Sequence, residues 1–212
     1  MLHLIEHTCP TPQENLAFDD ELLKREEEVL RLWEAPAPFV VLGRSGLIEQ
    51  EVDEEACARE GVPVLRRSSG GGTVLQAPGC LNYALILSLS ERPYLMNIEQ
   101  SYPAILGSVI RALDLPGLEV RCTDILFEGR KVSGNSQRRT RGWVLHHGTL
   151  LYKSMDLDAI ARVLREPLRQ PRHRKNRSHT EFLTRLPIDR EWLLQRLPSI
   201  NVRREQPQSG CP

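Results

Sequence analysis

The 212-residue chain has no pattern of paired cysteines and no excess of charge of either sign. It contains five cysteines, and no two of them form a CxxC pair. This spacing argues against both a disulfide framework and a structural zinc site. The 28 basic and 28 acidic residues cancel, so no broad electrostatic field would attract nucleic acid or an anionic membrane. Recognition of an anion must therefore be local.

Long hydrophobic runs are missing as well. No apolar stretch approaches the ~20 residues that cross a bilayer, and the N-terminal sequence lacks the basic start and apolar core of a signal peptide. A hydrophobic content of 40% and a charged content of 26% are ordinary for a globular protein. A chain of this length can bury one core without disulfides or metals. We therefore expect a soluble, cytoplasmic protein with no membrane or nucleic-acid partner.

The order of local sequence signals predicts an α+β domain. Thr11 is a suitable N-cap, Pro12 fits the first helical position, and Glu14 completes a capping box before the helical stretch Leu16–Glu28. Hydrophobic periodicity predicts further helices at 53–60, 97–113, 156–165 and 189–197, and strands at 39–42, 62–67, 81–88 and 143–152, with two more around Gly129. Strands gather centrally and helices at both ends, so we expect a mixed, mostly antiparallel sheet flanked by helices. We expect one domain over residues 1–202 with no C-terminal accessory domain, and a frayed tail over residues 203–212.

A run of three glycines follows one predicted strand, in the segment Arg66-Arg-Ser-Ser-Gly-Gly-Gly72. Consecutive glycines let the backbone approach a ligand closely and turn successive N–H groups inward, which makes a concave anion site. The two arginines add fixed charge and bidentate donors for phosphate oxygens. The spacing fits neither a Walker loop nor the dinucleotide fingerprint. On composition alone, a flexible turn with an exposed basic pair remains an open alternative.

The segment from Cys122 to Gly134 predicts a β-hairpin that brings a lysine beside a carboxylate. Glu128-Gly129 suits a two-residue turn, which predicts the pairs Phe127–Arg130, Leu126–Lys131, Ile125–Val132 and Asp124–Ser133. Because side chains alternate along strands, one face would carry Cys122, Asp124, Lys131 and Ser133, and the core face Ile125, Phe127 and Val132. Asp124 would then keep Lys131 charged and oriented, as a reaction needs when negative charge develops on a carboxylate and a phosphate together. The alternative is a solvated surface ion pair worth ~0–1 kcal/mol.

Two adjacent histidines, His146 and His147, lie in the last predicted strand. Their side chains should point to opposite faces, so at most one can join a given site. Apolar neighbours on both sides predict a buried central strand. No third ligand lies at metal-binding spacing, so we predict no protein-bound metal.

Taken in order, these segments resemble the lipoate–protein ligase A family, within the superfamily of biotin and lipoate ligases and octanoyltransferases. The resemblance covers about residues 10–185, and its matching pieces are Val40-Val-Leu-Gly-Arg44, Arg66-Arg-Ser-Ser-Gly-Gly-Gly-Thr-Val74, Asp124-Ile125, Gly129-Arg-Lys-Val-Ser-Gly134, Gln137-Arg138 and His147-Gly-Thr-Leu150. It implies a catalytic domain related to those of class II aminoacyl-tRNA synthetases and biotin ligases. It also implies an ATP-dependent ligase that activates lipoate or octanoate as an acyl-adenylate. The acyl group would pass to a lysine of a lipoyl carrier domain or of a protein like the glycine-cleavage H protein.

The resemblance implies roles for individual residues. Lys131 would be catalytic, contacting both the acyl carboxylate and the phosphate without becoming acylated. ATP would be bound by Arg67, Gly72, Thr73, Val74, Leu75 and Lys131; lipoate would be bound by Gly71, Gly72 and Lys131; and supporting roles would fall to Asp124, Ser133 and His147. Mg²⁺ would neutralise the leaving pyrophosphate.

Some features depart from the family pattern and leave alternatives open. Gln76 and Cys80 stand where the family often has His and Asn. Two-domain ligases of the family also carry an accessory domain, so a separate accessory subunit is one alternative. A transferase could instead use a thioester on Cys122, whose thiolate a cationic neighbour would favour. A non-catalytic subunit that binds the acyl carrier is a third reading, which an intact Lys131 disfavours. The glycine/arginine signature of a biotin ligase is absent.

Overall fold

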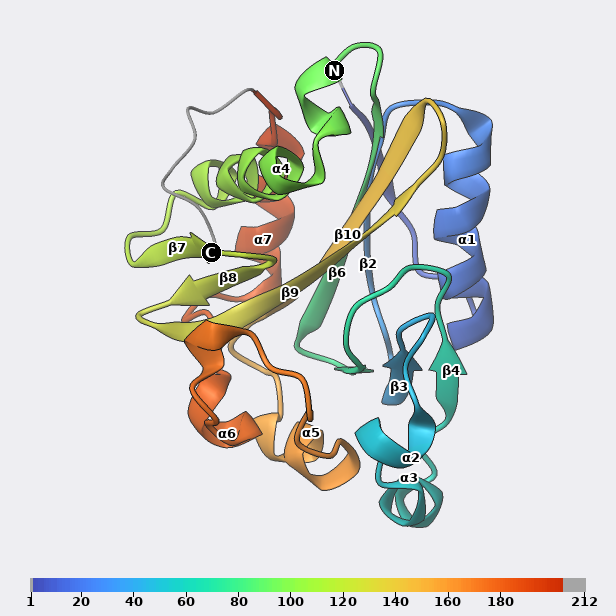
Figure 1. The fold of residues 1–212 in the computed structure, drawn as a ribbon, viewed down its shortest axis with the longest axis vertical. Coiled ribbons are helices and arrows are strands. Elements are labelled where there is room, and N and C mark those ends of the chain that lie inside the picture. Colours follow the sequence, from blue (N-terminus) through green and yellow to red (C-terminus); the bar gives the residue numbers. More distant parts are fainter. Residues whose placement is uncertain (1, 204–212) are drawn as a thin grey trace.

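The computed structural model describes residues 2–203 and is organised around two sheets (Figure 1). The strands are β1 (His3–Glu6), β2 (Val29–Glu34), β3 (Phe39–Leu42), β4 (Val64–Arg66), β5 (Val74–Gln76), β6 (Cys80–Ser88), β7 (Leu118–Arg121), β8 (Asp124–Phe127), β9 (Arg130–Arg139) and β10 (Trp143–Leu151). The larger sheet has the order β1-β2-β6-β10-β9-β8-β7, and only its β1–β2 pair is parallel. The smaller sheet has the order β4-β3-β5, with β3 and β4 parallel. The predicted mixed, mostly antiparallel arrangement is confirmed.

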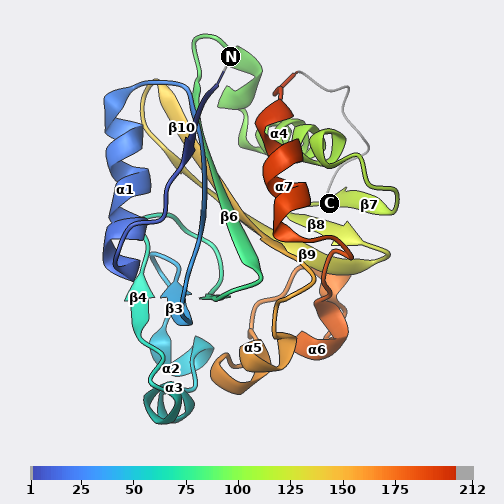
Figure 2. The same ribbon diagram turned by 180° about the vertical axis from the view of Figure 1, so that it is seen from behind.

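Helices cover both faces of the larger sheet, and further helices pack with the smaller sheet (Figure 2). The helices are α1 (Pro12–Arg25), α2 (Ile48–Glu51), α3 (Glu54–Glu60), α4 (Ile98–Leu113), α5 (Leu157–Val163), α6 (His179–Phe182) and α7 (Arg190–Arg196), with 3₁₀ turns at Pro93–Met96, Arg172–Arg174 and Leu197–Ser199. Along β6, Leu85 and Leu87 pack in the cluster with α4 and α7, whereas Ala84 and Ile86 pack with α1. Because both faces are covered, β6 is buried throughout. None of the helices among residues 2–203 is long and apolar enough to span a bilayer.

The sequence predictions hold best where a local signal sets the element. Thr11 and Glu14 form the predicted capping box at the start of α1. The helix ends at Arg25, short of the predicted Glu28, because Glu26 takes a left-handed conformation with φ 56°. Strands β1, β2, β5 and β7 and the short helices α2 and α6 were not predicted. Apart from Arg203, the predicted frayed tail lies outside the described residues.

Candidate functional site

Two arginines hold two neighbouring loops, each by hydrogen bonds to backbone carbonyls. Arg66 Nη1 donates to the carbonyls of Gly43 and Gly46 at 2.9 and 2.8 Å. Arg67 donates to the Ser69 hydroxyl and to three backbone carbonyls, those of Val41, Gly70 and Gly72. Burial lowers the Arg67 pKa to about 10, so the guanidinium stays charged at neutral pH. The Arg67 guanidinium therefore orders the glycine loop, which contradicts the alternative of a flexible turn, whereas Arg66 is exposed, as that alternative predicted.

The glycine loop is also packed tightly against its neighbours. A Cβ at Gly43 would lie 1.9 Å from the carbonyl oxygen of Gly71, so the two loops require glycine at their crossing. Gly71 itself has φ 88°, a conformation that side chains rarely allow. The Thr73 hydroxyl donates to Glu51 at 2.5 Å, and the Ser136 hydroxyl donates to the Gly70 carbonyl at 2.8 Å. These contacts fix the loop between α2 and β9.

The predicted hairpin places a lysine beside a buried carboxylate. Lys131 Nζ lies 2.9 Å from Asp124 Oδ1, and the Asp124 side chain is only 5% exposed, so this is not a solvated surface pair. His173 Nε2 lies 2.9 Å from the other carboxylate oxygen, Oδ2. Burial alone would raise the Asp124 pKa, but Lys131 and His173 together hold it below its ordinary value of 3.8. The carboxylate is therefore ionised at neutral pH and accepts from both partners.

One part of the predicted hairpin register is wrong. The left-handed turn at Glu128 and Gly129 is confirmed, with φ 51° and 74°, and so are the pairs Phe127–Arg130 and Leu126–Lys131. A β-bulge follows, so that Ile125 pairs with Ser133 and Asp124 with Gly134, not with Val132 and Ser133 as predicted. Val132 is the extra residue. It is fully buried in the same core cluster as Ile125, and this packing accounts for the bulge.

The two adjacent histidines face opposite sides of β10, as predicted. His146 is fully buried, which lowers its pKa to about 3 and keeps it neutral. His147 lies on the other face, where its Nε2 is 2.6 Å from the Ser69 hydroxyl and its Nδ1 is 3.8 Å from Asp19 Oδ2. Asp19 is in turn paired with the fully buried Arg31 at 2.6 Å. This series of contacts holds the His147 ring beside the glycine loop.

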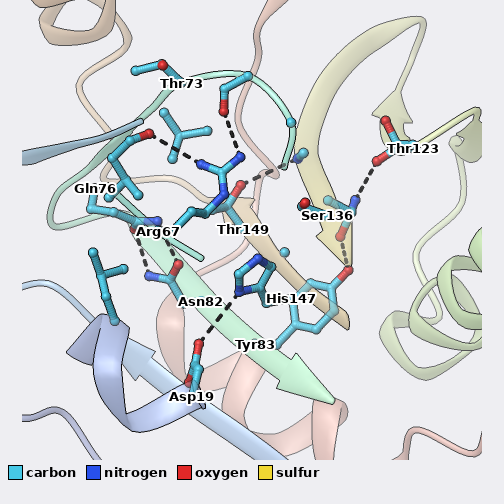
Figure 3. Close-up of a pocket in the computed structure, with 18 of the residues that line it drawn as sticks. Asp19, Arg67, Thr73, Gln76, Asn82, Tyr83, Thr123, Ser136, His147 and Thr149 are labelled. Carbon is cyan, nitrogen blue, oxygen red and sulfur yellow. Dashed lines mark hydrogen bonds and ion pairs between the residues drawn. The ribbon is translucent and has the colours of Figure 1, made fainter. Parts of the chain in front are cut away.

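Two adjoining cavities bring the predicted residues together (Figure 3). The larger, of about 170 Å³, is lined by the predicted residues Arg67, Gly71, Gly72, Thr73, Val74, Asp124, Lys131 and His147. The smaller, of about 90 Å³, is lined by the predicted residues Thr73, Val74, Leu75, Lys131 and Ser133. Every predicted site residue therefore lines one cavity or the other, and Lys131 lines both.

Several residues of the site were not predicted. Asn82 and Gln76 exchange hydrogen bonds of 2.7 and 2.8 Å at the wall of the larger cavity. Tyr83 donates to Asn135 at the same wall, and Figure 3 shows Asn82, Gln76 and Tyr83 around the cavity. The one available signal was Asn82, a lone amide in the apolar run of β6. Asn135, the partner of Tyr83, is 52 positions away in sequence, so no local pattern marks that contact.

The cysteines and acidic residues limit the chemistry further. Cys9, Cys57 and Cys80 are buried free thiols, and burial raises the Cys80 pKa to about 12. Cys122 is disulfide-bonded, and it is not among the residues that line either cavity. Within residues 2–203, no group of three or more His, Cys, Asp or Glu side chains is placed to hold a metal ion.

The fold is similar to that of solved lipoate–protein ligases. Its backbone superimposes with a TM-score of 0.78 and 23% identity on a structure from Thermoplasma acidophilum described as a bi-partite lipoate protein ligase and its E2 lipoyl domain, covering 93% of this chain and 80% of that one. The family model for the lipoyl protein ligase A/B catalytic domain matches residues 11–188, so the chain belongs to that family.

Curated relatives fall into two activity classes. The chain is 30% identical to the lipoate-protein ligase LplJ of Bacillus subtilis over 73% of its own length and 46% of the relative's. It is also 30% identical to the octanoyltransferase LipM of Carboxydothermus hydrogenoformans, over 85% of its own length and 78% of the relative's. The chain thus spans about half of the ligase and most of the transferase. Both classes are enzymes.

Proposed function

We propose that the chain is an ATP-dependent lipoate–protein ligase. It activates lipoate or octanoate as an acyl-adenylate and transfers the acyl group to a lysine of a lipoyl carrier domain. The observation that carries this proposal is the position of Lys131, whose side chain lines two adjoining cavities at once. A reaction that joins a carboxylate to a phosphate needs a cation at such a boundary.

The two cavities suit two different substrates. Among the residues that line the larger cavity are the apolar Leu16, Trp33, Val41 and Val74, together with Gly71 and Gly72. This combination suits an acyl chain that ends in a carboxylate. The smaller cavity is lined by the consecutive residues Thr73, Val74 and Leu75, and by Leu151, Ile160 and Leu164 among others. We assign it to the nucleotide.

The chemistry then has two steps. A carboxylate oxygen of the acyl substrate attacks the α-phosphorus of ATP, and pyrophosphate leaves. The carrier lysine next attacks the acyl carbonyl of the mixed anhydride, AMP leaves, and the new amide loses a proton. Lys131 stabilises the negative charge in both transition states, with Asp124 holding its ammonium at 2.9 Å. Mg²⁺ would be held largely by the ATP phosphates, which is its usual mode of binding.

The alternative is an octanoyltransferase that uses no ATP. The greater coverage of the octanoyltransferase relative, 78% of its length against 46% for the ligase, favours it. The position of Cys122 outside both cavities disfavours a thioester there. A non-catalytic subunit that only binds the carrier would release no pyrophosphate from ATP and would transfer no octanoyl group. The bi-partite ligase of similar fold suggests that an accessory subunit could take part in adenylation.

Mass spectrometry of a lipoyl domain separates these activities. The domain is incubated with the chain and lipoate, with and without ATP, and in parallel with an octanoyl carrier. A lipoyl mass increase that requires ATP, with release of pyrophosphate, supports the ligase. Octanoylation without ATP would identify the transferase. Lys131→Ala should abolish adenylate formation and Cys122→Ser should leave it nearly unchanged, whereas full activity in the Lys131 variant would contradict the assignment.

A further inference from the structure

A histidine from the C-terminal part of the chain completes the environment of Lys131. His173 lies in the 3₁₀ turn Arg172–Arg174 and contacts Asp124, 49 positions earlier in the sequence. Asp124 accepts from Lys131 at Oδ1 and from His173 at Oδ2, each at 2.9 Å. Because an ionised carboxylate can only accept hydrogen bonds, the Nε2 atom of His173 must carry the proton.

We propose that His173 is a positioning residue for the reaction proposed above. By holding one oxygen of Asp124, it fixes the other oxygen in the place where it orients the Lys131 ammonium between the cavities. A carboxylate with a single partner can rotate about its last side-chain bond, since that torsion is broad. A carboxylate held at both oxygens cannot rotate in this way. The inference rests on the proposed function, since it assigns a role within that reaction.

The surroundings of His173 fix its ring. The ring packs against Phe182 with centroids 5.7 Å apart, and the His173 carbonyl accepts from Arg177 at 3.0 Å. The turn that follows has two left-handed residues, Lys175 and Asn176, with φ 54° and 57°. Backbone of this kind persists only where the surrounding contacts determine it. His173 is therefore placed by the fold, not by its contact with Asp124 alone.

The same cluster reaches the substrate cavities. Phe182 is 2% exposed and lines the smaller cavity, and Lys131 Nζ lies 6.0 Å from the centre of its ring. Arg174, which is buried beside His173, also stacks on Phe182 at 5.1 Å and pairs with Glu166. A displacement of His173 would therefore reach Lys131, at the edge of both cavities, through Asp124.

Kinetics of the full-length chain test this role. His173→Ala should lower kcat for carrier acylation by about 10- to 100-fold, in line with the loss that follows misplacement of a reacting group, with KM for the acyl substrate changed less than about threefold. His173→Gln should restore most of the rate, because its amide N–H can donate to the same oxygen. In an Asp124→Asn background, His173→Ala should cause no further loss, because the role acts through Asp124. Arg172→Ala, an exposed neighbour on the same turn, is the control and should leave the rate unchanged.

A second measurement does not depend on activity. The second measurement is NMR of the chain with isotope-labelled lysine Cε atoms. The chain has only four lysines, at positions 24, 131, 153 and 175, so each signal can be assigned with single Lys→Arg variants. The Lys131 signal should move in His173→Ala and return in His173→Gln. If the alanine variant does not fold, His173→Met fills the same space without a donor and replaces it.

The possible results separate the two proposals. An unmoved Lys131 signal in the variants without a donor would overturn the role of His173. So would equal losses of rate in His173→Ala and His173→Gln, or a further loss in the Asp124→Asn background. If the wild-type chain modifies no carrier from any donor, the proposed function fails instead, and the Lys131 signal still reports whether His173 sets the environment of that lysine.

Discussion

The crossing of two loops at Gly43 and Gly71 gives the sharpest test of the site geometry. Substitution of Gly43 by Ala would place a Cβ 1.9 Å from the Gly71 carbonyl oxygen, where real Cβ contacts essentially never fall below 3.0 Å. The two loops must therefore part by about 1 Å, and a misplacement of that size costs roughly 100-fold in rate. Overpacking of this kind costs about 1–3 kcal/mol, which corresponds to a decrease in Tm of roughly 2–12 °C for a chain of this size. We expect Gly43→Ala to remain folded and to lose most of its activity.

The assay compares carrier acylation and thermal unfolding for two matched variants. Gly70→Ala is the control, because a Cβ there meets no atom within 4 Å and Gly70 has no left-handed φ. Gly70→Ala should keep its rate within about twofold and its Tm within about 2 °C, as expected for an unconstrained site. If Gly43→Ala keeps more than half of the wild-type rate, the loop crossing does not require glycine at position 43. An equal loss of rate in Gly70→Ala would contradict the prediction as well.

Three further substitutions test the packing and the charges. Arg31→Met should lower the free energy of unfolding by about 3–5 kcal/mol, because it leaves the buried Asp19 without its partner; a loss below about 1 kcal/mol in urea unfolding would contradict this. Ile125→Ala should lower it by about 2–5 kcal/mol, because the side chain is fully buried in the main core; calorimetry checks the value, and an unchanged Tm would contradict it. The folded-state pKa of Asp124 lies below its ordinary 3.8, so its ionised form adds stability above pH 3.8 that is lost as the pH falls through the folded pKa. The stability advantage of wild type over Asp124→Asn should therefore narrow below about pH 4 in urea titrations, and a constant difference would argue against an ionised Asp124.

Local signals predicted much of the fold, and non-local contacts explain most of what was missed. The capping box of α1 depends on two residues three positions apart, so the sequence alone could reveal it. Strand β2 was missed because Arg31 interrupts its apolar run. That arginine is fully buried because Asp19 and Asn15, from α1, and the His7 carbonyl supply its acceptors. No pattern within Val29–Glu34 could indicate that a helix outside this segment would compensate the charge of Arg31.

The hairpin illustrates the same limit at the scale of one residue. Counting outward from the turn predicted the contact between Lys131 and Asp124, because the turn fixes the first pairs. It could not predict the bulge at Val132, since the burial of that side chain in the core decides it. Counting pairs outward from the turn was nevertheless sufficient to predict the contact between Lys131 and Asp124, because their side chains remain 2.9 Å apart in the shifted register.

The charges of the larger cavity are nearly balanced before any ligand binds. Asp19 is compensated by Arg31 and Asp124 by Lys131, and the remaining charge, that of Arg67, is bound by the carbonyls of Gly70 and Gly72. The site therefore offers an incoming carboxylate little net positive charge in the ground state. What it offers is an ammonium held in place by Asp124, and its interaction strengthens most when charge increases on the reacting oxygens. Binding that is modest in the ground state and strong in the transition state is the condition for a high kcat. The pairing of each charge thus serves the reaction through orientation, which is why removal of a partner such as His173 should reduce turnover more than affinity.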